Sequence, residues 1–399
     1  MPKKERIGEI ELLRGLAFLA VALQHSIAHY AAVDGIGPAD GLWMTILVLA
    51  AKFAVPVFIF ITGLVLFYNY DGSLRYGSFI GKRFKDILVP YIFWSLIYFI
   101  VNQGLGHPFW PQFGKWAMML VTGKNSYHLW YIVMIFQFYL LFPLLRYIMR
   151  ECARRISFRW HAWTLAGFGL VCLMLLYNLF RISGWMAEAD IPVLTPFFTT
   201  YADRNFLYFA FYFILGAAAG MNPEAWKRLL LKGKYVYWPA FLLLFGYYAY
   251  ITVQSFGTPP EYHVSFNMLA LLRPLITLFL VSSIFVFYAS AKKWTEKSGP
   301  GSLKVMNALG RYSYGAYLAH ALMLRNSYNL DHWLFAGWNV TVRMMISFLV
   351  CVVLSYAVAM ALSYLPSGKW MVGVSSLRGN KRGRYPAQSS VPSRSVEGG

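Results

Sequence analysis

The residues of this chain best suited to chemistry lie in an otherwise apolar run near the N-terminus. The run EIELLRGLAFLAVALQHSIAHY, residues 9–30, contains Arg14, His25 and His29. A polar or charged side chain inside a hydrophobic helix is costly, so it must face a partner or a substrate. Imidazole suits proton transfer near neutral pH, and a guanidinium suits the binding of phosphate. The run therefore predicts a site that combines proton transfer with anion binding.

Helical spacing predicts different positions, and so different roles, for these three residues. Arg14 and His25 are eleven residues apart, within about 20° of three full turns, so they share a face at about 16 Å separation along the axis. His29 follows His25 by one turn, and its position near the helix end favours an interfacial residue. No HExxH pattern or carboxylate cluster supplies further ligands. We therefore expect no metal.

Composition places this run in a membrane protein. Of 399 residues, 58% are hydrophobic and only 13% are charged, about half the charged fraction of a soluble domain. The three cysteines show no paired spacing, so no disulfide framework is predicted. The basic N-terminal flank resembles that of a signal peptide. However, the apolar run is too long and lacks a cleavage site, so we interpret it as the first transmembrane helix.

The predicted fold class is an all-α integral membrane protein with about ten transmembrane helices. A spanning helix needs about 20 mostly apolar residues. Ten segments qualify: 10–32, 43–68, 86–103, 128–146, 162–181, 204–220, 236–254, 265–290, 305–325 and 339–364. The stretch 106–121 is too short and too rich in Pro and Trp to span, so it predicts an interfacial or re-entrant segment.

Basic residues separate between alternate loops of this arrangement. One set of loops and the two termini hold 26 of the 36 Lys and Arg residues, whereas the other loops hold three. The positive-inside rule then predicts that both termini are cytoplasmic. The net charge of +20 is mostly a matter of topology, so nucleic acid is not an expected partner. Residues 1–365 form the predicted membrane domain, and 366–399 a basic, disordered cytoplasmic tail near anionic lipid.

Six blocks in fixed order carry a family resemblance. They are LLRGLAFLAVALQHS (12–26), PVFIFITGLVL (56–66), KRFKDILVPYIFW (82–94), YHLWYIVMIFQFYLLFPLL (127–145), YFILGAAAG (212–220) and LGRYSYGAYLAH (309–320). Together they resemble the membrane acyltransferase-3 family, whose first helix has an early Arg-Gly and a His eleven residues after the Arg. The resemblance covers residues 8–364. Block 82–94 is most similar to the Gram-positive branch that contains biofilm-polysaccharide and intercellular adhesin acyltransferases.

The resemblance implies a ten-helix membrane domain that transfers an O-acyl group, usually acetyl and in some members succinyl, from cytosolic acyl-CoA to a carbohydrate. The essential arginine and histidine of the family map onto Arg14 and His25. Some members carry an added extracytoplasmic SGNH hydrolase-like domain. Because only a short tail follows residue 364 here, we expect the membrane domain or a partner to complete the transfer.

Residues of the donor site are expected near the cytosolic end. Arg14, with Lys82 and Arg83 of the first basic loop, offers positive charge for the phosphates of CoA, although topology alone also explains the loop charges. Ser313 lies in a matching block, where its hydroxyl can instead bond a backbone carbonyl.

Five residues are expected at the acceptor site, most of them in the outer half. They are His128, Trp130, Tyr91, His320 and Lys52. Aromatic residues at such positions also occur as membrane-interface belts, but Trp and Tyr can stack on sugars. Lys52 can bind an anionic acceptor such as a phosphate-containing glycan. His320, in the outer half of its helix, can approach His25.

The leading hypothesis is a multi-pass enzyme of the bacterial plasma membrane that acylates a cell-envelope or secreted polysaccharide, alone or in a synthase or export complex. His25 can remove the proton of the acceptor hydroxyl, or can be acylated transiently. The rival hypothesis is a transporter or flippase of an envelope glycan, and a third is a structural partner of a synthase. Loss of acylation without loss of export on His25→Ala distinguishes the first.

Overall fold

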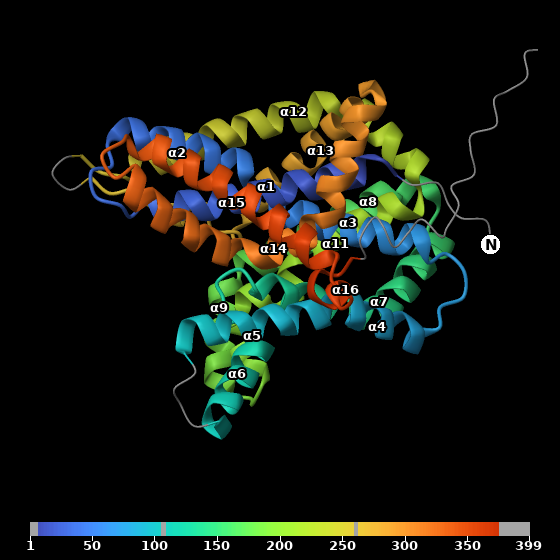
Figure 1. Cartoon of the computed structure of the whole chain (residues 1–399). Coiled ribbons are helices and arrows are strands. Elements are labelled where there is room, and N and C mark those ends of the chain that lie inside the picture. The colour runs from blue at the N-terminus through green and yellow to red at the C-terminus, as the bar shows by residue number, and fades with distance from the viewer. Residues whose placement is uncertain (1–6, 105–108, 259–261, 375–399) are drawn as a thin grey trace, which may run out of the picture.

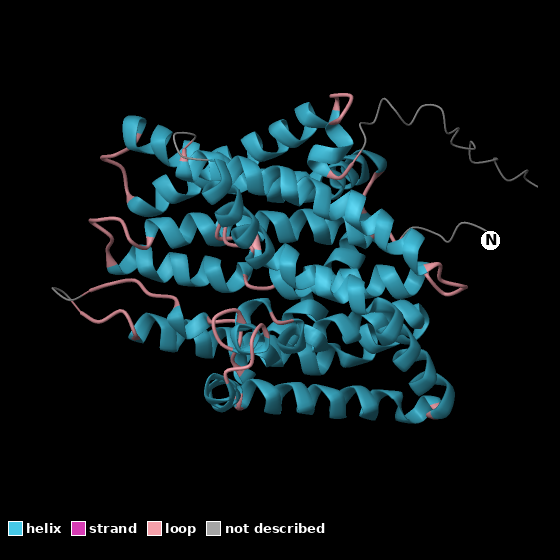
Figure 2. Ribbon diagram, turned by 90° about the horizontal axis from the view of Figure 1, so that it is seen from below, coloured by secondary structure: helices cyan, strands magenta, loops and turns pink. Residues whose placement is uncertain are grey.

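The computed structural model describes residues 7–104, 109–258 and 262–374, which are helical and contain no β-strand. Figure 2 shows the long helices lying side by side. The helices are α1 (Glu9–Tyr30), α2 (Pro38–Ala51), α3 (Ala54–Asn69), α4 (Tyr76–Arg83), the π-helical turn η1 (Phe84–Leu88), α5 (Val89–Gln103), α6 (Phe109–Thr122), α7 (Trp130–Arg155), α8 (His161–Tyr177), α9 (Leu179–Ala189), α10 (Leu194–Phe198), α11 (Ala210–Met221), α12 (Pro223–Gln254), α13 (Pro274–Lys297), α14 (Pro300–Leu334), α15 (Val340–Ser363) and α16 (Gly368–Val372). Short 3-10 turns, including η4 (Phe206–Phe209), join some of them.

Helices α1, α14 and α15 lie side by side through the middle of the molecule (Figure 1). Two glycines bring α1 and α14 together. A Cβ atom added at Gly310 would lie 2.2 Å from the backbone oxygen of Glu11, and one at Gly15 would lie 3.2 Å from the Cβ of Leu309. Only glycine fits at position 310 without moving the helices apart. This crossing sets the register of α14 along α1.

A second glycine contact joins α3 to α11. A Cβ at Gly216 would lie 2.0 Å from the carbonyl oxygen of Phe60, and one at Gly220 would lie 2.3 Å from that of Leu64. Gly63 of α3 meets the backbone of α11 in the same way. Small residues four positions apart let membrane helices approach backbone to backbone. The GAAAG block at 216–220 is thus a helix-packing motif.

Within the described residues, eight helical stretches are long and apolar enough to cross a membrane, and they correspond to eight of the ten predicted segments. Segment 204–220 corresponds to the shorter apolar stretch Phe206–Met221. Segment 305–325 lies in α14, which is 35 residues long but too polar to be counted by hydropathy. Most of its side chains between 310 and 324 are buried, so neighbouring helices rather than lipid surround it.

Two predicted segments have local irregularities. Segment 43–68 is not one regular helix, because α2 and α3 are separated at Lys52 and Phe53. Segment 86–103 begins inside η1, just before Pro90, whose missing N–H leaves a helix carbonyl without its usual donor. The hydroxyl of Tyr314 donates to the backbone oxygen of Ile87 at 2.7 Å. The region 106–121, predicted as non-spanning, contains α6.

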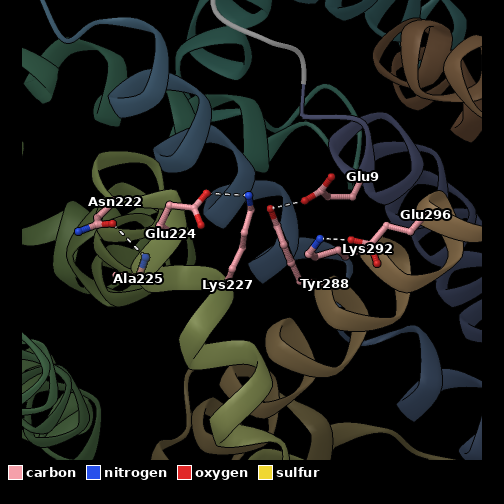
Figure 3. Close-up of polar contacts among 8 residues, drawn as sticks. All are labelled: Glu9, Asn222, Glu224, Ala225, Lys227, Tyr288, Lys292 and Glu296. Carbon is pink, nitrogen blue, oxygen red and sulfur yellow. Dashed lines mark hydrogen bonds and ion pairs between the residues drawn. The ribbon is translucent and has the colours of Figure 1, made fainter. Parts of the chain in front are cut away.

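The two ends of the bundle are joined by separate polar contacts. At one end, the Tyr288 hydroxyl donates to Glu9 at 2.9 Å, near an ion pair of Glu224 and Lys227 at 2.7 Å (Figure 3). Here the start of α1, the start of α12 and the end of α13 meet. At the other end, the Asp40 carboxylate at the start of α2 accepts hydrogen bonds from residues at the start of α15: Asn339 at 3.0 Å and the Thr341 hydroxyl at 2.6 Å.

The first residues of the predicted tail are folded. Helix α16 packs against α5, α14 and α15, with Val372 fully buried. The indole Nε1 of Trp94 donates to the backbone oxygen of Met371 at 3.0 Å, and Lys369 lies 3.6 Å from the carboxylate of Asp86. The remainder of the tail, 375–399, lies outside the described residues.

Candidate active site

Three histidines from distant parts of the chain meet in the middle of the bundle. His25 comes from α1, His320 from α14, and His128 from the turn that precedes α7. The ring centroids of His25 and His320 are 5.4 Å apart and nearly parallel, and those of His128 and His320 are 4.5 Å apart. His320 is therefore the central member of this histidine cluster, which consists of His25, His128 and His320.

The glycine crossing explains why His25 and His320 meet. His25 lies ten residues beyond Gly15, and His320 lies ten residues beyond Gly310. Because α1 and α14 run in the same direction, the same advance of about 15 Å along each helix brings the two imidazoles together. The close approach of the backbones at Gly310 keeps the helices near enough for their rings to stack.

His128 is held by the surrounding turn. Its Nδ1 lies 3.1 Å from the hydroxyl oxygen of Ser126, and the hydroxyl of Tyr317 donates to its backbone oxygen. Asn125, three residues earlier, is buried and donates to the hydroxyl of Ser95 in α5 at 2.6 Å. The turn 125–128 is thus tied to two helices, which fixes the direction of the His128 ring.

Two ring nitrogens of the cluster are buried without a hydrogen-bond partner: Nε2 of His128 and Nε2 of His320. Their side chains are almost completely buried. Buried polar atoms in folded proteins nearly always have partners, so an exception calls for a ligand or a chemical role. Although three imidazoles meet, no group of three or more His, Cys, Asp or Glu residues within the described ranges is arranged to hold a metal ion.

His25 lies at the accessible side of the cluster. Its ring is 4.6 Å from that of Tyr127, whose side chain is 55% exposed. The positive charge of Lys52 acts electrostatically on His25. Lys52 lies at the break between α2 and α3, where Gln24 of α1 donates to the free carbonyl of Ala51 at 2.9 Å. The break thus places Lys52 where its charge acts on His25.

Arg14 lies three turns from His25 and is joined to the cluster through tyrosine rings. It pairs with Glu11 at 3.4 Å and keeps 35% of its side chain exposed. Its charge acts electrostatically on Tyr131, whose ring centroid is 6.0 Å from that of Tyr317. The Tyr317 ring is in turn 5.3 Å from His128. Tyr131 and Tyr317 therefore lie between the region where the Arg14 charge acts and His128.

Arg83 and Lys82 have different surroundings although they are neighbours in sequence. The Arg83 guanidinium carbon lies 5.4 Å from the ring centroids of Phe79 and Tyr139 and 5.8 Å from that of Tyr70. Its Nε is buried without a partner. Lys82 is exposed. The Arg83 guanidinium is therefore fixed by aromatic rings and keeps one N–H donor for a ligand, whereas Lys82 is a charge on the surface.

Other predicted site residues lie outside the cluster. The Ser313 hydroxyl donates to the backbone oxygen of Gly310 at 2.8 Å, and the Tyr91 hydroxyl donates to that of Leu120. Trp130 packs against Phe209, with ring centroids 5.9 Å apart. The exposed ring of His29 stacks on Tyr328 at 3.6 Å. The structure brings together His25, His128 and His320, with Lys52 near enough for its charge to act on His25, whereas the contacts named above for these other residues are made elsewhere.

Sequence reasoning missed Tyr127 and Tyr317. Both lie in the blocks that carried the family resemblance, but tyrosine is common in this chain, so neither type nor spacing singled them out. Tyr317 precedes His320 by three residues, and its backbone oxygen lies 2.5 Å from the Nδ1 of that histidine. A contact made by a backbone oxygen cannot be predicted from the type of the residue.

Comparison with known families gives one match. The model of the acyltransferase domain family, acyltransferase-3, matches residues 7–364. No curated protein and no solved structure matches the chain. The matched range runs from the start of α1 through the end of α15 and contains the whole histidine cluster. The chain thus belongs to the acyltransferase-3 family, and it is a multi-pass membrane protein and an acyltransferase.

Proposed function

We propose that the protein transfers an acyl group from cytosolic acyl-CoA to a hydroxyl of a cell-envelope or secreted polysaccharide, with a histidine as general base. The observation that carries the proposal is the histidine cluster on the Arg14 face of α1. A neutral hydroxyl is a poor nucleophile, and imidazole is the side chain best matched to remove its proton near neutral pH. The proposed acyl group is acetyl, with succinyl as the alternative.

The proposed topology has ten spans and both termini in the cytoplasm of a bacterial cell. The contacts at the ends of the bundle support it. The start of α1 with Glu9, the start of α12 with Glu224 and the later part of α13 with Tyr288 meet at one end (Figure 3), as alternating spans require. Counting α14 and Phe206–Met221 with the eight apolar stretches gives the ten.

The donor is proposed to bind between Arg14 and Arg83. Arg83 contacts Tyr139 of α7, and the charge of Arg14 acts electrostatically on Tyr131 of the same helix. Guanidinium groups recognise the phosphates of CoA through paired N–H donors. Exposed Lys82 adds charge at the entrance. The pantetheine arm would then extend along α1 toward His25.

The acceptor is proposed to bind at the His128, His320 and Lys52 side of the cluster, next to Tyr127. A ring such as that of Tyr127, exposed and set against His25, is suited to stacking on a sugar. Roles for Tyr91, Trp130 and Ser313 stay predictions. The hydroxyls of Tyr91 and Ser313 already bond backbone oxygens.

The acceptor class and the partners follow from the family branch. Similarity of the 82–94 block to biofilm-polysaccharide acyltransferases supports a secreted glycan as acceptor and a synthase or export complex as partner. Membrane lipid surrounds the apolar helices. The basic residues are accounted for by topology, so nucleic acid is not proposed as a partner.

The test is mass spectrometry of envelope glycans from a deletion strain complemented with wild type, Arg14→Ala, His25→Ala or His29→Ala. We expect ester groups with wild type and with His29→Ala, and none with the other two. Labelled acetyl-CoA supplied to inside-out vesicles tests the donor. Ester groups restored by His25→Ala contradict the proposal, and a glycan that is exported by wild type but never esterified favours a transporter.

A further inference from the structure

His320 has one ring nitrogen whose hydrogen is assigned by its surroundings. Its Nδ1 lies 2.5 Å from the backbone oxygen of Tyr317. A carbonyl oxygen can only accept a hydrogen bond, so Nδ1 carries the hydrogen. Nε2 of the neutral ring is then a bare lone pair, and it is the nitrogen that is buried without a partner. A ligand that donates a hydrogen bond to Nε2 would supply the missing partner.

The groups that face His320 define what that ligand is. The rings around it are those of Phe18 and His25 of α1, Tyr127 and His128 of the turn before α7, and Tyr317 on its own helix. On the α15 side, the thiol of Cys351 lies 3.5 Å from the His320 backbone oxygen. No Asp, Glu, Lys or Arg is among these contacts. A hydroxyl, neutral and able to donate to Nε2, suits this environment.

His128 supplies the complementary half of such a site. Its Nε2 has no hydrogen-bond partner of normal geometry among the described residues, although the backbone oxygen of Leu318 also acts on the ring, and the ring is 4.5 Å from that of His320. When the Ser126 hydroxyl donates to Nδ1, across 3.1 Å, the hydrogen of the neutral His128 ring is on Nε2. The pair then presents one donor and one acceptor. A hydroxyl oxygen accepts from the first while its hydrogen points to the second.

We propose that His128 and His320 together bind the acceptor hydroxyl and that Nε2 of His320 removes its proton, a proposal that rests on the acyltransferase function proposed above. The O–H proton moves to Nε2 while the oxygen bonds to the acyl carbon. The bond between that carbon and the CoA sulfur breaks, and the sulfur leaves with the electron pair. The thiolate then takes the proton from the His320 imidazolium, which restores the neutral ring.

In this assignment, the histidines of α1 and α14 have different roles. His25 lies on the Arg14 face of α1, toward the donor, and within the described residues neither of its ring nitrogens has a hydrogen-bond partner that fixes a tautomer. His320 on α14 is the histidine whose free lone pair is fixed. His25 therefore serves the acyl group, and His320 serves the hydroxyl that receives it.

The experiment compares wild type with His320→Gln and His29→Ala in inside-out vesicles, with labelled acetyl-CoA as donor and the glycans of the vesicles as acceptor. Glutamine keeps a polar side chain but cannot take a proton. We expect kcat for ester formation to fall about 10²–10⁴-fold, with KM for acetyl-CoA within about twofold of wild type, because the donor site is untouched. His29→Ala is expected to behave as wild type.

The pH profile separates a base from a merely structural residue. The wild-type rate should level off once the base is neutral, whereas the residual rate of His320→Gln should keep rising about tenfold per pH unit, since hydroxide then replaces the base. A His320→Gln rate equal to wild type, a wild-type plateau in that variant, or a joint loss of acetyl-CoA binding overturns the inference. Absence of ester with wild type instead overturns the proposed function.

Discussion

Most polar side chains among the central helices are committed to backbone oxygens or to one another. Ser26 of α1 donates to Met344 of α15 at 2.9 Å, and the hydroxyls of Tyr30 and Ser347 are 2.7 Å apart. Burying a polar group without a partner costs about 1–3 kcal/mol. The free nitrogens of the histidine cluster are among the exceptions to this pattern, as is the hydroxyl of Tyr312, and an exception that gathers several imidazoles calls for a chemical role.

Arg83 and Ser313, both predicted from the sequence as donor-site residues, should respond differently to mutation. Arg83→Ala removes a cation with a free Nε and is expected to raise KM for acyl-CoA about tenfold, by the loss of one charge-assisted hydrogen bond. Ser313→Ala removes a hydroxyl that serves Gly310 and should change KM less than twofold. Initial rates against acyl-CoA concentration check both, and a larger effect of Ser313→Ala would contradict the assignment.

The buried ion pair between α14 and α15 should be sensitive to removal of one partner. Asp331 and Arg343 are 2.8 Å apart, with side chains only 4% and 11% exposed. Asp331→Asn leaves a buried guanidinium uncompensated and should cost about 3–5 kcal/mol. Thermal unfolding in detergent measures the effect. Lys227→Ala, which breaks an exposed pair, is the control and should cost at most about 1 kcal/mol; equal losses would refute the burial argument.

At the scale of helices, close approach through glycine determines which elements are neighbours. Lipid tails are as apolar as leucine, so packing between membrane helices depends on small residues and interhelical hydrogen bonds rather than on hydrophobicity. Gly310 brings α14 onto α1, and Gly216 and Gly220 bring α11 onto α3. The first of these contacts places two of the three histidines.

Gly216→Ala should destabilise the protein by separating α3 and α11. The new Cβ would lie 2.0 Å from a backbone oxygen, so a helix must shift, at a cost of about 1–3 kcal/mol or more. Gly246→Ala in α12 is the matched control, because a Cβ there meets nothing within 4 Å. We expect a lower unfolding temperature for the first variant only, measured on the purified protein in detergent.

Gly310→Ala should affect catalysis as well as stability. Its Cβ would lie 2.2 Å from the backbone of α1, and a shift of α14 displaces His320 from His25 and His128. Misplacement of reacting groups by about 1 Å can cost about 10²-fold in rate. Ester formation per folded molecule, compared with that of Gly216→Ala, tests this. A similar specific activity in both variants would mean that the crossing does not position the site.

At the scale of the whole molecule, the helices form one bundle. Polar contacts join helix ends at each of its two ends: Glu9 with Tyr288 at one, and Asp40 with Asn339 and Thr341 at the other. The exposed Cys152, at the basic end of α7, and the exposed Ser255, after the end of α12, belong to opposite sides in the proposed topology. The other two cysteines are buried, so labelling of single exposed positions reports the sidedness directly.

An impermeant maleimide should label Ser255→Cys in intact cells, and should label Cys152 only after the membrane is permeabilised. The reason is that the end of α7 is rich in arginine, and loops rich in Lys and Arg lie on the cytoplasmic side of the membrane. Mass spectrometry of the purified protein locates the label, and a Cys152→Ala background removes the native signal for the Ser255 position. Labelling of Cys152 in intact cells would reverse the proposed orientation.

By itself, the sequence determined the membrane class, most of the spanning segments and the pairing of Arg14 with His25 on one face. These features depend on the partition of side chains between lipid and water and on helical geometry, both of which are local. The restriction to local information also explains which sequence predictions failed. Hydropathy could not show the break at Lys52, and α14 passes no hydropathy criterion because its surroundings are protein.

Only the tertiary structure decided which polar residues meet. His25, His128 and His320 are separated by 103 and 192 positions in sequence, and their contact depends on a register between α1 and α14 set by two glycines and on a turn tied to α5. It also showed that Ser313 and Tyr91 bond backbone oxygens, and it assigned the free nitrogen of His320. Such contacts arise from packing between distant segments, so residue type and spacing alone do not contain them.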